Sequence, residues 1–402
     1  MVGGLAGLLA HRGITVFRAN AAFHADETAP ATSNHIVHLV PSPDQSDILT
    51  YHKADVPEPS GPTMDLTATN IVIATGAKPR PLPGNPFAGA LIDSTQALEV
   101  NEFPSSAVII GAGAIALEFA SMWNAAGSKV TLLIRKDRVL SAWDRRAGTT
   151  LTRELKRHGV NIITRASVTH VDTGANLGAT VHYTREGQDG EQSVWGEIAL
   201  VAIGRDPITD PAWGVTIDDH GHVATDAYGR TDKPGVWAVG DVTAGHALAH
   251  RAFEQGIVIA ETIAGLNPKP VDEATVPQIV FSFPEAASVG LTVEQAQARE
   301  DLIEIKETNY PMLANARMLM SGTAGSLTIV SGCDAANPDT PRVLGVHMIS
   351  QMASDIIAEA EQLVGNHVPL ADAARLVHPH PTFSETLGEA LLKADGRPLH
   401  TR

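Results

Sequence analysis

The sequence has little cysteine and few basic residues. Its 402 residues include one cysteine, Cys333, so no disulfide can form within the chain, and this favours a reducing compartment such as the cytoplasm. The 29 Lys and Arg residues are outnumbered by 45 Asp and Glu residues, for a formal net charge of −16. Binding to nucleic acid or to an anionic membrane surface needs an excess of Lys and Arg. The composition therefore argues against both kinds of partner.

The sequence also lacks a long uninterrupted hydrophobic run. The longest apolar stretch, residues 107–127, contains Glu118 and several glycines, whereas a membrane-spanning helix needs about 20 consecutive apolar residues. The apolar start, MVGGLAGLLAHRG, has no basic residue ahead of its apolar part, so no signal peptide is predicted. With 44% hydrophobic and 18% charged residues, the chain has the composition of an ordinary globular protein of two or three domains.

Short apolar runs predict the strands of an α/β fold. Residues 71–74 and 107–111 are apolar enough for strands buried on both faces, and a helical segment joins the second run to the strand at 129–134, as in a βαβ unit. Residues 26–69 predict an antiparallel meander with a long polar loop between Pro41 and Pro62. In the α+β segment at the C-terminal end, Cys333 is expected in the polar loop SGCDAANP.

Gly111, Gly113 and Ala116 form the pattern G-x-G-x-x-A directly after the strand predicted at 107–111. This strand–turn–helix context is typical of dinucleotide binding. We interpret Gly111 as the residue of the tight turn, and Gly113 as the point where a pyrophosphate approaches the backbone. Ala116 would let the helix pack closely on the sheet, and the helix N-terminus would offer free N–H groups to the phosphates. A glycine-rich turn without a ligand is the alternative.

The end of the next strand bears on the choice of nucleotide. NAD-binding sites usually have an acidic residue there, but this chain has Ile134 followed by Arg135 and Lys136. Guanidinium and ammonium groups bind phosphate well, so the pair predicts NADP(H) in preference to NAD(H). A solvated basic pair is the alternative.

Two further segments predict flavin binding. The segment TDKPGVWAVGD, which ends in Gly240 and Asp241, resembles a flavin-binding fingerprint in which the aspartate accepts a hydrogen bond from the ribityl chain. The second segment is ATG, which includes Thr75 and Gly76. For Asp241 alone, a helix N-cap is the alternative.

His380 and Glu385 in HPHPTFSE are candidates for acid–base chemistry. A carboxylate beside an imidazole fixes its tautomer, which suits a general acid or base. A surface loop with a chance histidine and glutamate is the alternative. The histidines outside this segment are interpreted as structural, and without a CxxC or HExxH motif no metal site is predicted.

Taken in order, these motifs resemble the pyridine nucleotide–disulfide oxidoreductases, flavoproteins that include dihydrolipoamide dehydrogenase and glutathione reductase. The segments that carry the resemblance are IVIATGAKPRPLPG, VIIGAGAIALEFA, GVWAVGDVTAGHALAHRAFEQG and HPHPTFSETLGEALLKADGRPLH. The resemblance implies an α/β fold with tandem Rossmann-like FAD and NAD(P) domains and a C-terminal α+β dimerisation domain. It places an N-terminally incomplete FAD domain at 1–105 and 206–272, an NAD(P) domain at 106–205 and an interface domain at 273–402.

The resemblance also implies roles for individual residues. Hydride would pass between NADP(H), or in second place NAD(H), and FAD, and electrons between the flavin and a lipoamide-like disulfide or dithiol. His380 and Glu385 would form the acid–base dyad and reach the active site of the other subunit of a homodimer, and Glu118 would lie near nicotinamide and flavin. The implied cofactor-binding residues are Thr75, Gly76, Gly111, Gly113, Ala116, Glu118, Arg135, Lys136, Gly204, Gly240 and Asp241.

Two family features are absent from these 402 residues: an N-terminal GxGxxG unit and a CxxxxC pair. We therefore expect an N-terminally truncated form of a longer enzyme, with impaired activity, and a short relative without disulfide chemistry is the alternative. A glutathione- or mycothiol-type disulfide reductase using NADPH and an inactive nucleotide-binding fragment are the alternative functions.

Overall fold

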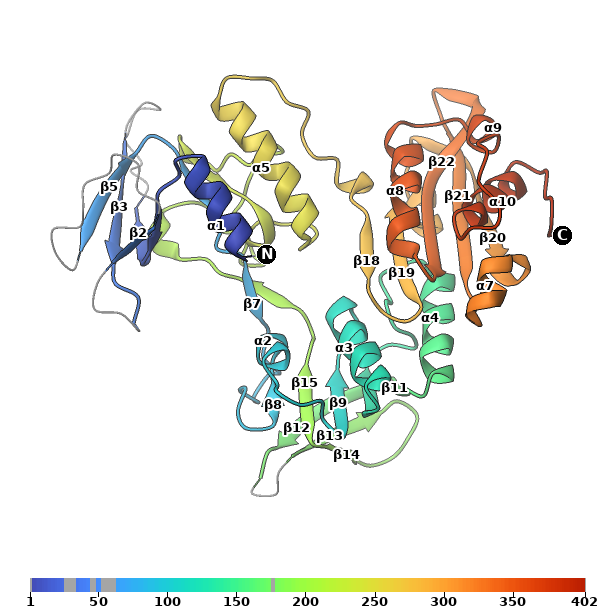
Figure 1. Ribbon diagram of the computed structural model, residues 1–402, viewed down its shortest axis with the longest axis horizontal. Coiled ribbons are helices and arrows are strands. Elements are labelled where there is room, and N and C mark those ends of the chain that lie inside the picture. The colour runs from blue at the N-terminus through green and yellow to red at the C-terminus, as the bar shows by residue number, and fades with distance from the viewer. Residues whose placement is uncertain (1, 25–33, 44–47, 52–62, 175–177, 402) are drawn as a thin grey trace. The chain divides into compact units, whose positions relative to one another are not determined.

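The computed structural model describes residues 2–24, 34–43, 48–51, 63–174 and 178–401 (Figure 1). These form two compact units, each built from two separate parts of the chain. Unit 1 comprises residues 1–78 and 206–271, and unit 2 comprises residues 79–205 and 272–402. The chain passes between the units at β7 (Ala77–Pro79) and β16 (Arg205–Pro207), which form a two-stranded sheet.

Unit 1 contains small sheets and two longer helices. The predicted meander is present as the antiparallel sheet β2–β3–β5, while β1 pairs with β4 and β6 pairs in parallel with β17. Most of the loop expected between Pro41 and Pro62 lies outside the described residues, although β4 falls within it. The elements are α1 (Val2–His11), β1 (Val16–Arg18), β2 (Asn20–Phe23), β3 (His35–Val40), β4 (Leu49–Tyr51), β5 (Met64–Ala68), β6 (Ile71–Ile73), η1 (Pro211–Trp213), β17 (Val236–Ala238), η2 (Gly240–Val242) and α5 (Ala249–Ile263).

The prediction that the strand at 71–74 is buried on both faces is wrong. Ile73 is buried in a small core with Val236 and Trp213, but Val72, on the opposite face, is 44% exposed. Successive side chains of a strand point to opposite faces, and among the described residues only one face of β6 is covered.

The first part of unit 2 is a parallel α/β sheet with the strand order β11–β10–β9–β15–β8. Its core includes Trp123, Leu117 and Leu132, none of which is accessible to solvent. The βαβ unit that the sequence predicts is therefore confirmed. The elements are β8 (Leu91–Ile92), α2 (Ser94–Leu98), β9 (Ser106–Ile110), α3 (Ala114–Ala125), β10 (Lys129–Ile134), α4 (Arg145–Arg157), β11 (Asn161–Thr164) and β15 (Ile198–Val201).

A second, antiparallel sheet of three strands lies on this domain. Its strands are β12 (Ala166–Asp172), β13 (Ala179–Arg185) and β14 (Gln192–Gly196). Val181 and Tyr183 on one face are buried in a core shared with Val108 of β9 and Val201 of β15. The opposite face of this sheet carries polar side chains that include histidines.

The second part of unit 2 is the α+β segment that the sequence predicts. Its antiparallel sheet has the order β18–β19–β22–β21–β20, and α8 and α10 pack against it. The elements are η3 (Glu273–Thr275), β18 (Gln278–Val280), β19 (Glu285–Gly290), α6 (Val293–Gln297), β20 (Leu302–Pro311), η4 (Met312–Ala314), α7 (Ala316–Ser321), β21 (Ser326–Asp334), β22 (Asn337–Ser350), α8 (Ala353–Gly365), α9 (Leu370–Ala373) and α10 (Glu385–Ala394).

The expectation that Cys333 lies in a polar loop is wrong. Cys333 is a residue of β21, pairs with Ile303 of β20 and is fully buried. The polar residue that follows it, Asp334, still belongs to the strand because both of its carboxylate oxygens accept hydrogen bonds from Arg342 of β22, at 2.9 and 2.7 Å. Burial raises the pKa of the Cys333 thiol.

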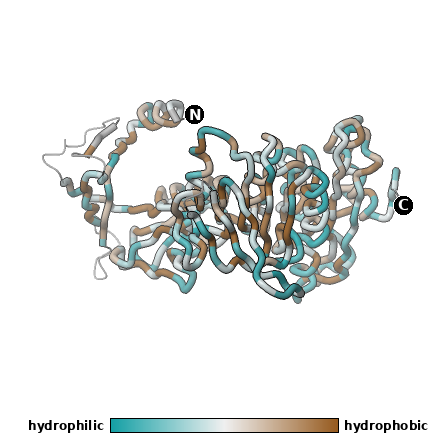
Figure 2. Tube along the Cα trace, turned by 90° about the horizontal axis from the view of Figure 1, so that it is seen from below, coloured by the Kyte–Doolittle hydropathy of each residue, from teal (hydrophilic) through white to brown (hydrophobic). Residues whose placement is uncertain are grey.

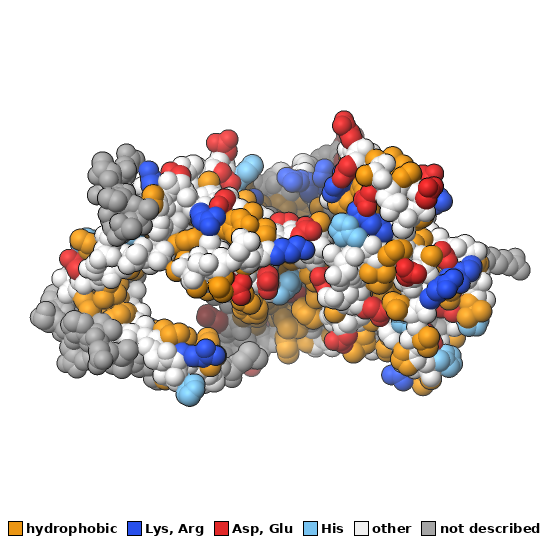
Figure 3. Space-filling model, turned by 90° about the horizontal axis from the view of Figure 1, so that it is seen from above, with side chains coloured by type: hydrophobic (Ala, Val, Ile, Leu, Met, Phe, Trp, Pro, Cys, Tyr) orange, Lys and Arg blue, Asp and Glu red, His pale blue; other side chains and the backbone are white. Residues whose placement is uncertain are grey.

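The surface agrees with the composition. Figure 2 shows hydrophilic and hydrophobic segments alternating along the chain, and on the face drawn in Figure 3 acidic and basic side chains are interspersed. Among the side chains coloured in Figure 3, no continuous basic surface is visible. Within the described part of the chain, no helix combines the length and the hydrophobicity needed to cross a membrane.

Candidate active site

The predicted dinucleotide-binding residues meet at one edge of the parallel sheet. Gly111 follows β9, Arg135 follows β10 and Gly204 lies shortly after β15, and all three strands are parallel neighbours. The chain runs from β9 to β10 on one side and later returns to β15 on the other, so β9 and β15 flank the topological switch point. Ligands of open α/β sheets bind at the carboxyl edge at such a point.

The three small residues of the G-x-G-x-x-A pattern have different surroundings. Gly111 has a φ of 142°, and a Cβ atom there would overlap the carbonyl oxygen of Ala202, just after β15. Gly113 has an ordinary φ of −91°, and no heavy atom lies within 4 Å of the position its Cβ would take. Ala116 is fully buried. Close packing therefore requires Gly111 and Ala116, whereas Gly113 faces open space.

The N-terminus of α3 is free to receive an anion. Its N-cap is Gly113, which has no side chain to accept hydrogen bonds, and the first turn holds no acidic residue. The backbone N–H groups of this turn therefore have no side-chain cap, and they carry the partial positive charge of a helix N-terminus.

Arg135 and Lys136 are both exposed at the end of β10. Neither side chain has a hydrogen-bond or ion-pair partner among the residues the structure describes. The carboxylate of the next residue, Asp137, lies 3.1 Å from Arg138 and 3.8 Å from Arg145. The Asp137 carboxylate, next to the basic pair in sequence, is therefore already engaged with two other arginines.

The predicted flavin-binding residues meet at an edge of unit 1. β6 and β17 are parallel neighbours, so Thr75 and Gly76 after the first strand and Gly240 and Asp241 after the second lie at the same edge. The Asp241 carboxylate has no hydrogen-bond or ion-pair partner in the described ranges. It does not cap α5 either, because the N-cap of that helix is Leu248.

Local hydrogen bonds hold this edge in place. The Thr75 hydroxyl donates to the carbonyl oxygen of Ile208 at 2.7 Å, and the Gly240 N–H donates to the side chain of Gln255 at 3.0 Å. Arg251 of α5 is buried and donates to the carbonyl oxygen of Ala244 at 2.5 Å, which fixes the loop after Asp241. Neither Gln255 nor Arg251 belongs to the residues predicted from the sequence.

Glu118 joins the two halves of unit 2. Its Oε1 atom accepts a hydrogen bond of 3.0 Å from the backbone N–H of Phe281, just after β18. One turn along α3, the Ser121 hydroxyl accepts a hydrogen bond of 3.2 Å from the N–H of Phe283. Both contacts attach α3 to the segment that follows β18.

The predicted dyad is formed. His380 Nδ1 lies 2.7 Å from Oε2 of Glu385, the first residue of α10. The His380 side chain is 75% exposed, and its Nε2 atom has no hydrogen-bond partner among the described residues, whereas Glu385 is only 16% exposed. The imidazole is therefore held at one nitrogen and open at the other.

Asn315 holds the carboxylate of the dyad, and sequence reasoning missed it. Its Nδ2 atom donates to Glu385 Oε1 at 2.9 Å and to the carbonyl oxygen of Thr382 at 3.0 Å. Its Oδ1 atom accepts a hydrogen bond from the N–H of Met318 and so caps α7. A buried asparagine in the sequence LANAR carries no local signal for a partner 70 residues away.

A second His–Glu pair lies in the same segment. His378 Nε2 is 2.8 Å from Glu359 Oε1 of α8. The hydrogen bond to Glu359 raises the pKa of His378, against the opposing effect of burial. His378 is the first histidine of HPHP and is not among the functional residues predicted from the sequence.

Comparisons with known proteins show which family has this arrangement of residues. The family model described as pyridine nucleotide-disulphide oxidoreductase matches residues 6–256, and its dimerisation-domain model matches residues 276–391. A dihydrolipoyl dehydrogenase of Cupriavidus necator is 37% identical over 341 residues, which cover 83% of this chain and 70% of the relative. A dihydrolipoyl dehydrogenase of Bacillus subtilis is 32% identical over 406 residues, covering 100% of this chain and 78% of the relative.

Solved structures show the same fold. LpdA from Mycobacterium tuberculosis matches with a TM-score of 0.81 at 24% identity, over 98% of this chain and 80% of that one. The HOCl-induced flavoprotein disulfide reductase RclA from Escherichia coli matches with a TM-score of 0.72 at 26% identity, over 82% of this chain and 74% of that one.

The fold and the candidate site define a dinucleotide-dependent oxidoreductase of the flavoprotein class. More specifically, the chain belongs to the pyridine nucleotide–disulphide oxidoreductase family, and it resembles the dihydrolipoyl dehydrogenases within it. The family implies FAD and a pyridine nucleotide as cofactors. The fold class and the family that the sequence predicts are therefore confirmed.

Proposed function

We propose that this protein moves hydride between NADP(H) and FAD, with NAD(H) as the weaker nucleotide, in an enzyme that acts on a lipoamide-like disulfide or dithiol. The family match over residues 6–256 carries this proposal. The nucleotide supplies a hydride and the flavin accepts it, and the chain's own residues bind and orient the two cofactors.

The basic pair supports the preference for NADP(H). The pyrophosphate would lie over Gly113 at the free N-terminus of α3, and the 2′-phosphate would lie against Arg135 and Lys136. Both cations are exposed, while the neighbouring Asp137 is paired with Arg138. A charge-assisted hydrogen bond to phosphate contributes about 1.5–3 kcal/mol, so NADPH should bind about ten- to a hundredfold more tightly than NADH.

The edge formed by β6 and β17 supports flavin binding. We assign Asp241 to the ribityl chain, since its carboxylate is partly exposed and unpaired among the described residues. Thr75, Gly76 and Gly240 would line the same edge. Glu118 would lie near nicotinamide and flavin, and Gly204 would be a further cofactor-binding residue. In this scheme the FAD domain comprises residues 1–105 and 206–272, the NAD(P) domain 106–205 and the interface domain 273–402.

The dyad supports action across a homodimer. His380 would hold or release a proton at Nε2, while the Glu385 carboxylate fixes the imidazole through Nδ1. Its exposure suits a histidine that meets the site of a second subunit, and residues 276–391 match a dimerisation domain. A cytoplasmic location stays a prediction from the single cysteine.

Nucleotide titration and flavin bleaching test the cofactor part of this function. NADPH and NADH are titrated into the 402-residue protein reconstituted with FAD, and flavin bleaching is followed with each nucleotide. We expect tighter binding and faster bleaching with NADPH, and equal affinities would contradict the nucleotide assignment. No flavin binding and no bleaching with either nucleotide would contradict the proposal as a whole.

A reductase of small disulfides that uses NADPH is the second candidate, and the basic pair at 135–136 favours it. Comparing turnover of dihydrolipoamide with that of glutathione and mycothiol disulfides separates the two functions. The only cysteine in these 402 residues is buried in β21, so this comparison requires a protein that also holds a redox-active thiol pair.

A further inference from the structure

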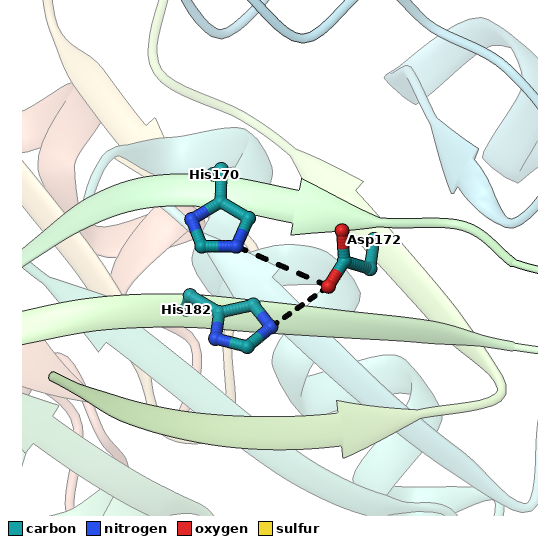
Figure 4. A group of neighbouring side chains, drawn as sticks. All are labelled: His170, Asp172 and His182. Carbon is teal, nitrogen blue, oxygen red and sulfur yellow. Dashed lines mark hydrogen bonds and ion pairs between the residues drawn. The ribbon is translucent and has the colours of Figure 1, made fainter.

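We propose that His170, Asp172 and His182 form a binding site for a zinc-type divalent cation on the outer face of the three-stranded sheet. Two imidazoles and one carboxylate are ligands that Zn²⁺ accepts, and the three side chains lie next to one another in Figure 4. Their ligand atoms all lie within 4.8 Å of one another. The site has no part in the proposed redox chemistry and does not depend on it.

The strand geometry brings the three side chains together. His170 and Asp172 are two residues apart on β12, so both point to the same face of the sheet. His182 lies directly opposite His170 on β13. The inner face of the sheet is occupied by buried residues such as Val181 and Tyr183, so the three polar side chains share the outer face.

The distances suit a single ion. Asp172 Oδ2 lies 3.0 Å from His182 Nε2 and 3.9 Å from His170 Nε2. With metal–ligand bonds of about 2.0–2.2 Å, the ligand atoms of a tetrahedral zinc site are about 3.3–3.5 Å apart, so the two distances bracket that separation. Small side-chain rotations would complete the site, and solvent would supply the remaining ligand.

The two imidazoles are already aligned. Their rings are stacked, with centroids 4.1 Å apart and planes 8° from parallel. Both Nε2 atoms face Asp172, while both Nδ1 atoms face Glu191, at 3.8 Å for His170 and 3.7 Å for His182. The Thr169 hydroxyl donates to Glu191 Oε1 at 2.7 Å and holds this second carboxylate in place.

Glu191 is therefore a positioning residue for the site. Metal-binding histidines usually donate their second ring N–H to a second polar group, often a carboxylate, which fixes the tautomer that leaves the other nitrogen free for the metal. Here His170 Nδ1 lies 3.3 Å from the Thr169 hydroxyl, and Glu191 lies at ion-pair distance from both Nδ1 atoms. Neither Asp172 nor Glu191 has a lysine or arginine partner among the described residues, so their negative charge is available to a cation. These features distinguish the cluster from an ordinary surface pair such as His38 and Asp65, whose atoms lie 2.5 Å apart with no second histidine.

Zinc titration of the untagged 402-residue protein tests the proposal. The protein is stripped of metal with a chelator, and Zn²⁺ binding is measured by calorimetry and by competition with a fluorescent zinc chelator. We expect one strong site per chain. His170→Gln, His182→Gln and Asp172→Asn should each weaken it at least about tenfold, and Glu191→Gln should weaken it by about tenfold. His38→Gln is the matched control and should leave the affinity unchanged.

Spectroscopy identifies the ligands independently of affinity. With Cu²⁺ as the probe, electron paramagnetic resonance should detect two imidazole nitrogens in the unaltered protein and one in His170→Gln. His170 is 47% exposed, so this variant should fold normally, which circular dichroism in the absence of metal checks. Absence of a strong zinc site, an affinity that none of the three ligand substitutions changes, or an equal loss in His38→Gln would overturn the proposal.

Discussion

Gly111 lies against the carbonyl oxygen of Ala202, so that a Cβ atom at Gly111 would overlap this oxygen. The contact joins the turn after β9 to the end of β15, at the switch point of the parallel sheet. Gly113, only two residues further on, has no neighbour within 4 Å of its Cβ position. Gly111 is therefore required for close packing, whereas we propose that Gly113 leaves room for a ligand.

Alanine substitution at each of these glycines should separate an effect on stability from an effect on nucleotide binding. Gly111→Ala combines a steric overlap with an unfavourable φ, so we expect a loss of about 3 kcal/mol in the free energy of unfolding. Gly113→Ala should change that free energy by less than about 1 kcal/mol but weaken NADPH binding. Urea unfolding and nucleotide titration measure the two effects. Equal destabilisation by both substitutions would contradict this distinction.

Reversing the charge at Arg135 should reduce the preference for NADPH. Arg135→Glu removes a phosphate contact and adds repulsion, so the dissociation constant of NADPH should rise by about ten- to a hundredfold, while that of NADH changes little. Arg299→Glu makes the same charge change in the second part of unit 2 and is the control. A parallel loss for both nucleotides would show that Arg135 does not contact the 2′-phosphate.

Asn315 should matter for both stability and the dyad. Asn315→Ala removes the cap of α7 and the hydrogen bond to Glu385, so we expect a loss of about 2 kcal/mol in the free energy of unfolding. Asn315→Asp keeps an oxygen for the cap but replaces the donor with a second acidic group beside Glu385. This variant should recover part of the stability, and the pH dependence of flavin reoxidation should still differ from that of the unaltered protein. Full recovery of both properties would contradict the role of the Asn315 amide.

The pair formed by His378 and Glu359 should stabilise the fold at low pH only. Because the pKa of His378 is raised above its ordinary value of 6.5, the contribution is fully present below that value and is lost as the pH rises through the folded-state pKa. Glu359→Gln should lower the free energy of unfolding by about 1 kcal/mol near pH 5, a modest amount because Glu359 is partly exposed. Near pH 9, where His378 is neutral, the substitution should change it by almost nothing. Urea unfolding at the two pH values measures this, and a larger loss at high pH would reverse the sign that the structure predicts.

Cys333 should be unreactive in the folded protein. It is fully buried and burial raises its pKa, so little thiolate is available to a reagent. We expect a coloured disulfide reagent to label it only as fast as the protein unfolds, and to label one thiol per chain at once in urea. Rapid labelling of the native protein would contradict its burial in β21.

The candidate site was predictable where its signal is local. The G-x-G-x-x-A turn, the basic pair after β10 and the HPHPTFSE segment are each continuous in sequence. The structure has the first two at the ends of the predicted strands, and in the third it brings His380 and Glu385 together. Cys333 was misplaced because polar residues around it suggested a loop, although the Asp334–Arg342 contact extends the hairpin there. Val72 was misplaced because an apolar run does not reveal which face of a strand is covered.

Partners distant in sequence could not be predicted. Asn315, at the N-cap of α7, meets Glu385 of α10 only through tertiary structure, and His170 meets His182 only through the register of β12 and β13. The sequence pattern H-x-D at 170–172 fixes a common face for two of the cluster's members, but not the residue opposite them. The missing information is therefore tertiary packing at the first place and strand register at the second.

The division of unit 1 into two stretches of chain has a consequence for synthesis. β6 leaves the ribosome long before β17, the one strand partner it has among the described residues, because residues 79–205 come between them. The inserted stretch contains every strand of the parallel sheet and can be completed first. Until residue 238 has been made, β6 has a free hydrogen-bonding edge, and a chaperone that shields this edge during translation would act on unit 1 rather than unit 2.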